Sequence, residues 1–145
     1  MTLIYLSIQV RHGKAAVEEN TRTANIGVLE QHTQAQSRWR GRLAEEGELA
    51  EIWVAAKRGR DALNEIDRER FNQHGRDFFN IWRSSFAAAQ SIKHEGQMEH
   101  IAVSFATMAS GHQGLLELWD AGGKKYSELT VPEFVETVEK AMGRT

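Results

Sequence analysis

The chain lacks cysteine altogether and has a single proline, Pro132. The absence of cysteine excludes disulfides, thiolate nucleophiles, and zinc or iron–sulfur sites that depend on cysteine. Because no proline occurs in the first 131 residues, long helices are unobstructed there. The net charge of −2 lacks the basic excess that is typical of dedicated nucleic-acid binders, so we expect no nucleic-acid partner.

Recognisable catalytic and metal-binding motifs are also missing. No histidine has a glutamate three residues before it, and no His-Glu-x-x-His, Gly-x-Ser-x-Gly or P-loop pattern occurs. The nearest cluster is His94, Glu95, Glu99 and His100, which Gly96 is expected to interrupt by ending a helix, so these are predicted to be solvated residues. We therefore expect no catalytic residues, no metal ligands and no cofactor.

The 145 residues form one domain in size, and one stretch organises it. From Asp61 to Glu95 large apolar residues recur at helical spacing, with Phe71, Phe78, Trp82 and Phe86 as the main positions. This spacing predicts a long central amphipathic helix. The fold class that follows is all-α, a bundle of about six helices around residues 61–95, with no β-sheet.

The N-terminal segment Met1–Val10 is almost entirely apolar or β-branched, and Arg11, His12 and Lys14 follow at once. It fits three structures: a buried strand, the apolar start of a core helix, or the trailing end of a membrane helix. Ten residues do not span a bilayer, which needs about 20. The prompt change to basic residues is typical of a helix leaving a membrane on its cytoplasmic side.

Residues Leu3–Arg11, LIYLSIQVR, resemble the end of a membrane segment in a loose family of small, uncharacterised bacterial proteins, where the pattern is L-I-Y-L-x-x-Q-x-R. Glu48–Gly59, Phe71–Trp82 and Leu118–Met142 resemble later helices of the same family. The resemblance implies an N-terminal membrane segment followed by an all-helical soluble domain. It implies no activity. The front half of the family's membrane segment is missing from this chain, so whether the segment spans a membrane stays open.

After the apolar segment, Gly13 is a plausible break, and Lys14–Leu43 predicts a long polar helix. Its apolar stripe is thin and consists of Ile26, Leu29, Thr33, Gln36 and Leu43. So thin a stripe indicates a helix that partly stands clear of the core, or one that packs against a second copy of the chain.

Shorter helices are predicted at Glu48–Lys57, Gln97–Ser110 and Gly114–Ala121, with a flexible turn at residues 122–125. The clearest local signal is the start of the last helix. Thr130 is expected to cap it, Pro132 to occupy its first turn, and Glu133 to complete a capping box.

We divide the chain into residues 1–12, an apolar segment that is a partial membrane anchor, and residues 13–145, a single helical domain. The expected function is non-enzymatic: a helical interaction or scaffolding protein on the cytoplasmic side of a bacterial membrane, with the cytoplasm as the alternative location. The partner is a membrane or membrane protein, with a homo-oligomer as an alternative. Residues expected to contact lipid or a partner helix are Leu3, Ile4, Tyr5, Leu6, Ile8 and Val10, with Arg11 and Lys14 at the headgroup level.

A second hypothesis is a soluble helical sensor that binds a small apolar ligand or lipid between helices. The residues expected to line that site are Phe78, Trp82, Phe86 and Phe105. Two short basic runs, 38–42 around Trp39 and 57–60, are either an anion-binding surface with Trp39 free to stack, or ordinary helix ends that attract cations.

Overall fold

The computed structural model of the chain describes residues 2–144, and all its regular elements there are helical, so the all-α fold class is confirmed. The α-helices are α1 (Thr2–Glu45), α2 (Gly47–Ala55), α3 (Glu65–Ser91), α4 (Glu95–Ser110), α5 (Gln113–Leu118), α6 (Lys124–Thr130) and α7 (Pro132–Ala141). Two 3₁₀ turns, η1 (Ala56–Arg58) and η2 (Arg60–Ala62), precede α3, and a π-helical segment, η3 (Trp119–Gly123), joins α5 to α6.

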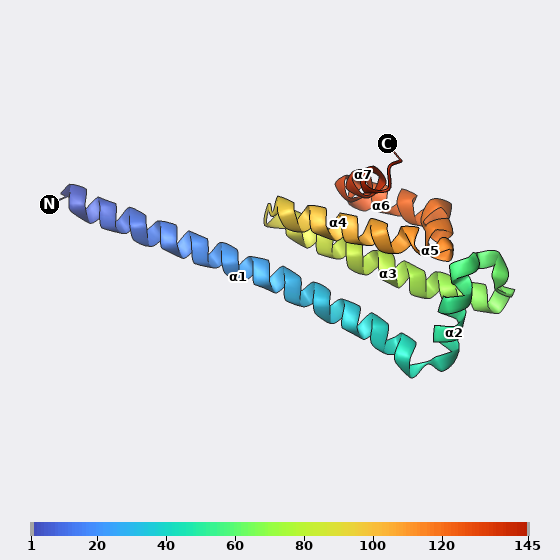
Figure 1. Cartoon of the computed structure of the whole chain (residues 1–145). Helices are drawn as coiled ribbons and strands as arrows, with labels where there is room; N and C mark the ends of the chain where they lie inside the picture. The colour runs from blue at the N-terminus through green and yellow to red at the C-terminus, as the bar shows by residue number, and fades with distance from the viewer. Residues whose placement is uncertain (1, 145) are drawn as a thin grey trace.

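The long first helix, α1, is unbroken over 44 residues, and Figure 1 shows its N-terminal half extending away from the other helices. The expected break at Gly13 is wrong. One glycine within a helix costs only about 1 kcal/mol relative to alanine, and the alanines at 15 and 16 favour helix. Residues 2–10 are therefore helical, and the strand interpretation of them is wrong as well.

The C-terminal half of α1 packs on the body of the protein through a face that matches the expected stripe only at Gln36 and Leu43. Val28 and Trp39 are buried, whereas Ile26 and Leu29 are each nearly half exposed. The body-facing positions include His32 and Gln36, which are polar. The predicted stripe therefore included Gln36 and Leu43 of this face and missed Val28, His32 and Trp39.

The central helix α3 is present but shorter than residues 61–95. The side chain of Asn64 caps it by accepting a hydrogen bond from the Asp67 backbone N–H at 2.9 Å. Residues 60–62 form the separate 3₁₀ turn η2 because Gly59, with φ of 115°, redirects the chain just before it.

The turn from α3 to α4 does not use Gly96, which lies in the first turn of α4. Lys93 adopts the left-handed conformation instead, with φ of 57°. The imidazole of His94 then accepts the backbone N–H of Gln97 at 3.0 Å and caps α4. The predicted stop at Gly96 is wrong because a histidine cap was not anticipated.

The expected flexible turn at residues 122–125 is also wrong, because η3 continues the helical chain through it. Gly123 permits a close approach to α3, since a Cβ there would lie 2.7 Å from the ring of Phe79. Pro132 occupies the first turn of α7 as expected, but Thr130 belongs to the end of α6, where its hydroxyl donates to the Tyr126 carbonyl at 3.1 Å, and Val131 is the N-cap.

The core is a continuous set of aromatic rings that α3 presents in two directions. Phe78 of α3 lies 5.1 Å from the ring of Trp39 of α1 and 5.9 Å from that of Phe105 of α4. Phe105 extends the set to Trp119 at 5.0 Å and Phe134 at 5.3 Å, which brings in η3 and α7. Helices α3 and α4 lie side by side at the centre of the body (Figure 1).

The packing of α5 against η1 gives a direct stability test at Gly114. A Cβ there would lie 2.6 Å from the backbone oxygen of Ala56 and 3.1 Å from the ring of Phe71. We expect Gly114→Ala to lower the free energy of unfolding by about 1–3 kcal/mol, because backbone cannot move aside as a flexible side chain does. Gly41→Ala in α1 is the control. It meets nothing within 4 Å, so better helix propensity should raise stability slightly. Urea denaturation measures both, and equal effects would contradict the packing argument.

Candidate functional site

The arm, defined here as residues 2–23 of α1, carries all eight of the predicted contact residues. Every described residue of the arm is exposed. The exposed fraction is 83% for Leu3, 68% for Ile4 and 69% for Val10, with Tyr5, Leu6 and Ile8 at about one half or more. Arg11 and Lys14 follow on the same helix. The structure therefore brings these residues together on one projecting segment that makes no buried contact with the body.

The apolar side chains of the arm surround the helix rather than forming a stripe. Successive residues of an α-helix point about 100° apart, so Ile4, Tyr5 and Leu6 already face three directions. A helix that packs on one partner surface shows one apolar face, whereas one that is apolar all round is typical of an environment that encloses it. Across residues 2–144, none of the helices has the length and hydropathy to cross a membrane.

Trp39 is the main residue that fixes α1 to the body. Its indole N–H donates to the backbone oxygen of His74 at 3.1 Å, and the two rings stack with centroids 4.4 Å apart. Only 6% of Trp39 is exposed. The hypothesis that Trp39 is free to stack on a base or lie at a lipid headgroup is therefore wrong.

Polar contacts that the sequence did not indicate fix α1 to the body between the arm and Trp39. The imidazole of His32 bridges Ser85 of α3, through Nδ1, and Gln36, through Nε2 at 2.9 Å. Gln97 of α4 donates to the backbone oxygen of Asn25 at 3.3 Å. Together with Trp39, these contacts fix residues 25–39 to the body. The arm lies on the N-terminal side of the first of these contacts. Only the i, i+4 spacing of His32 and Gln36 was visible in the sequence.

The four residues predicted to line a ligand site are buried in the ring core. Phe78, Trp82 and Phe105 lie within about 6 Å of one another by ring centroids, and Phe86 packs on Phe134 at 5.3 Å. The cavity next to Phe78 and Trp82 has a volume of about 10 Å³, room for one water molecule. In this structure these side chains fill the space between the helices.

Histidines of the body serve helix ends and packing. His112 caps α5 by accepting the Leu115 backbone N–H at 3.3 Å, and its Nε2 lies 3.1 Å from the Trp53 carbonyl. Within residues 2–144, no group of three or more His, Asp or Glu side chains is placed to hold a metal ion. The side chains of His94, Glu95, Glu99 and His100 are therefore not arranged as such a group.

The buried His74 has the most perturbed acid–base equilibrium. Its ring stacks on that of Trp39 and meets that of Trp53 edge-on, and within the described chain its Nε2 has no hydrogen-bond partner. Burial, with a smaller effect from the nearby Arg42, lowers the pKa of His74 to about 4, although Asp77 acts in the opposite direction. The same cause, burial, lowers the pKa of His32 and of His112.

These directions predict a loss of stability in mild acid. The unfolded chain binds protons at histidine near pH 6.5, while folded His74 does so only near pH 4, so protonation favours unfolding as the pH falls between these values. We expect His74 to contribute a loss of up to about 3 kcal/mol across this window. Urea denaturation at pH 7.5, 6, 5 and 4 measures it.

His74→Phe keeps a ring in the stack and removes the titrating group, so its stability should depend less on pH between 6.5 and 4. The exposed His12→Phe is the matched control, because it removes a histidine that packs on nothing. If His74→Phe and the unmodified protein lose stability in parallel as the pH falls, His74 is not the group responsible.

Comparison of the chain with models of known protein families, with curated proteins and with solved structures finds no match. The resemblance of Leu3–Arg11 to a membrane-segment ending stays a prediction.

Proposed function

We propose that this protein is a non-enzymatic helical interaction protein whose arm inserts the segment Leu3–Val10 into a lipid bilayer while the helical body remains in water. The observation that carries the proposal is the exposure of six large apolar side chains around the whole circumference of a helix that projects from the body. Lipid hydrocarbon surrounds an inserted helix on all sides, which a single partner groove does not.

The exposed apolar area of the arm favours insertion into lipid. Complete burial of a Leu, Ile or Val side chain contributes about 1.5–3 kcal/mol, and the arm carries several such side chains in eight consecutive residues. At a rise of about 1.5 Å per residue the segment contributes about 12 Å of apolar helix, close to the hydrocarbon half-thickness of roughly 15 Å. These magnitudes support partial insertion.

Arg11 and Lys14 supply the second part of the argument. They come directly after Val10, where a helix entering a bilayer passes the headgroups, and long basic side chains are favoured at that level. The only ion pair of Lys14 among the described residues is with Glu18 at 3.9 Å, and both groups are largely exposed. Such a pair contributes little, so Lys14 is available to anionic lipid. Basic residues at this boundary place the body on the cytoplasmic side in our proposal.

The absence of an activated nucleophile among residues 2–144 supports the non-enzymatic part of the proposal. The pair that most resembles one is Ser85 with His32. The Ser85 hydroxyl already donates to the Ile81 carbonyl at 2.8 Å, so it accepts from His32 Nδ1 and does not give it a proton. The imidazole in this arrangement joins α1 to α3 and does not act as a base.

Vesicle co-sedimentation tests the membrane proposal with a matched pair of variants. Ile4→Ser/Val10→Ser removes two apolar side chains from the segment, whereas Val17→Ser/Ile26→Ser removes the same two residue types from exposed positions further along α1. We expect the first variant to bind neutral vesicles about 100-fold more weakly than the unmodified chain, and the second to bind nearly as well. Anionic vesicles should bind more tightly in a salt-sensitive manner because of Arg11 and Lys14.

Several results would overturn this function. One is failure of the unmodified protein to sediment with either vesicle. Another is an equal loss of binding in the two variants. A third is oligomerisation that Ile4→Ser/Val10→Ser abolishes, without vesicle binding, since this identifies a second copy of the chain as the occupant. Circular dichroism of both variants establishes that the body stays folded.

A further inference from the structure

An open pocket of about 420 Å³ lies on the side of α3 that faces η2, η3 and the start of α6. This volume lies in the range of small-molecule sites, about 300–1,000 Å³. It is separate from the arm and from the ring core between α3 and α1. Its lining combines an apolar floor with three arginines, Arg60, Arg76 and Arg83, on the surrounding helices and turns.

The floor consists of packed, preformed apolar groups. Phe79 and Leu118 both line the pocket. They are 2% and 5% exposed, so packing holds both side chains in place and only their edges reach the pocket. Gly123 lies directly against the Phe79 ring, where a Cβ would approach to 2.7 Å. Gly122 is beside it and a Cβ there would meet nothing within 4 Å. The π-helical segment thus brings bare backbone to the pocket where side chains would otherwise fill it.

Of the three pocket arginines, Arg83 is the one that no carboxylate within residues 2–144 neutralises. Its guanidinium donates to the side-chain oxygen of Asn80 at 2.6 Å and lies 4.5 Å from the ring centroid of Tyr126. Across residues 2–144, no carboxylate forms an ion pair with it. Partial burial lowers the pKa of Arg83, with Tyr126 acting in the opposite direction, yet a guanidinium stays charged at neutral pH.

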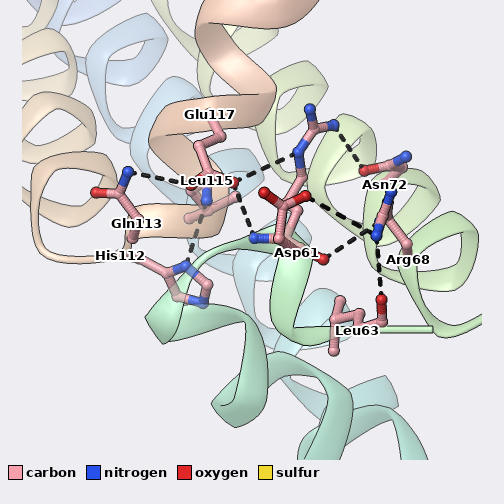
Figure 2. A network of polar contacts seen from close by, with 9 residues as sticks. Asp61, Leu63, Arg68, Asn72, His112, Gln113, Leu115 and Glu117 are labelled. Carbon is pink, nitrogen blue, oxygen red and sulfur yellow. Dashed lines mark hydrogen bonds and ion pairs between the residues drawn. The ribbon is translucent and has the colours of Figure 1, made fainter. Parts of the chain in front are cut away.

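The two other arginines are unequal. Arg60 is tied to its neighbours: its Nη1 donates to Asn72 at 3.1 Å, its backbone N–H donates to Glu117 at 2.8 Å, and its Nε lies 3.8 Å from the same carboxylate. In Figure 2 the carboxylate of Glu117 lies on one side of the turn that carries Asp61, and Asn72 of α3 lies on the opposite side. Arg76 has only a weak, exposed pair with Glu69 at 3.8 Å. One guanidinium is therefore neutralised, one weakly, and Arg83 not at all.

We propose that this pocket binds a small organic carboxylate whose apolar body lies on Phe79 and Leu118 and whose carboxylate pairs with Arg83. An unpaired, partly desolvated guanidinium is unfavourable on its own and favours an oxyanion, which it can hold through two parallel N–H···O bonds. The apolar floor excludes a bare inorganic anion as the best occupant, and the guanidinium excludes a neutral one. The ligand chemistry is thus an anion with a hydrocarbon tail or ring.

This inference does not rest on the arm, because no pocket residue belongs to α1. It also differs from the ligand site expected from the sequence, which placed an apolar ligand among Phe78, Trp82, Phe86 and Phe105. Those rings fill their own space. The proposed pocket lies on the next face of α3, about 100° around the helix from Phe78, where Phe79 is located.

Isothermal titration calorimetry of the full chain with sodium octanoate tests the proposal. We expect one saturable site, with binding at least about tenfold weaker in Arg83→Gln, which keeps a hydrogen-bond donor but no charge. Arg83→Lys should retain part of the affinity. The matched control is Arg70→Gln, on the same helix but paired with Glu48 outside the pocket, and it should bind as the unmodified chain does.

Three further titrations separate this site from other modes of binding. Gly122→Leu places a side chain in open space at the pocket wall, so it should reduce octanoate binding without loss of thermal stability. Octanol and inorganic phosphate should each bind at least tenfold more weakly than octanoate. Ile4→Ser/Val10→Ser should leave octanoate affinity unchanged. The proposal fails if octanoate does not bind, if Arg83→Gln binds normally, if phosphate or octanol binds equally well, or if the arm variant removes binding.

Discussion

The burial of α3 from two opposite sides is the constraint on which the rest of the structure depends. The ring of Phe78 touches Trp39 of α1 in one direction and Phe105 of α4 in the other, and Phe105 extends the same contact to Trp119 and Phe134. Because close-packed interiors tolerate little change in volume, a displacement of α3 disturbs both layers together. The body and the C-terminal half of α1 thus form one packed unit, and the arm lies outside it.

The same helix packs against α1 with one face and borders the pocket with another. Residues of α3 at 74, 78 and 85 face α1, whereas those at 76, 79 and 83 face the pocket. On the first set, Ser85 is hydrogen-bonded to His32 of α1, whereas the buried Nε2 of His74 has no hydrogen-bond partner within the described chain. On the second set, Arg83 is left without a carboxylate. One face of α3 is therefore buried against α1, and the other leaves a charged group at an open pocket.

Hydrophobic spacing predicted the helices and the central place of α3, because Phe71, Phe78, Trp82 and Phe86 all lie on its buried side. It failed where polar side chains perform structural work. His94 caps α4 and displaces the expected stop at Gly96, and His32, which lies outside the predicted stripe of α1, joins that helix to Ser85 of α3. The pocket was equally hidden, since Arg60, Arg83 and Gly122 are brought together only by tertiary packing and by a π-helical turn that no short motif announces.

The continuity of α1 through Gly13 has a geometric consequence. Residues 11–23 are exposed, helical and without a break, so they act as a strut about 20 Å long between the apolar segment and the first contacts with the body. A flexible linker of the same length would let the body lie against whatever surface holds Leu3–Val10. If the arm inserts as proposed, a straight helix would instead fix both the distance and the direction of the body relative to the membrane, and with them the distance of the Arg83 pocket from the lipid surface.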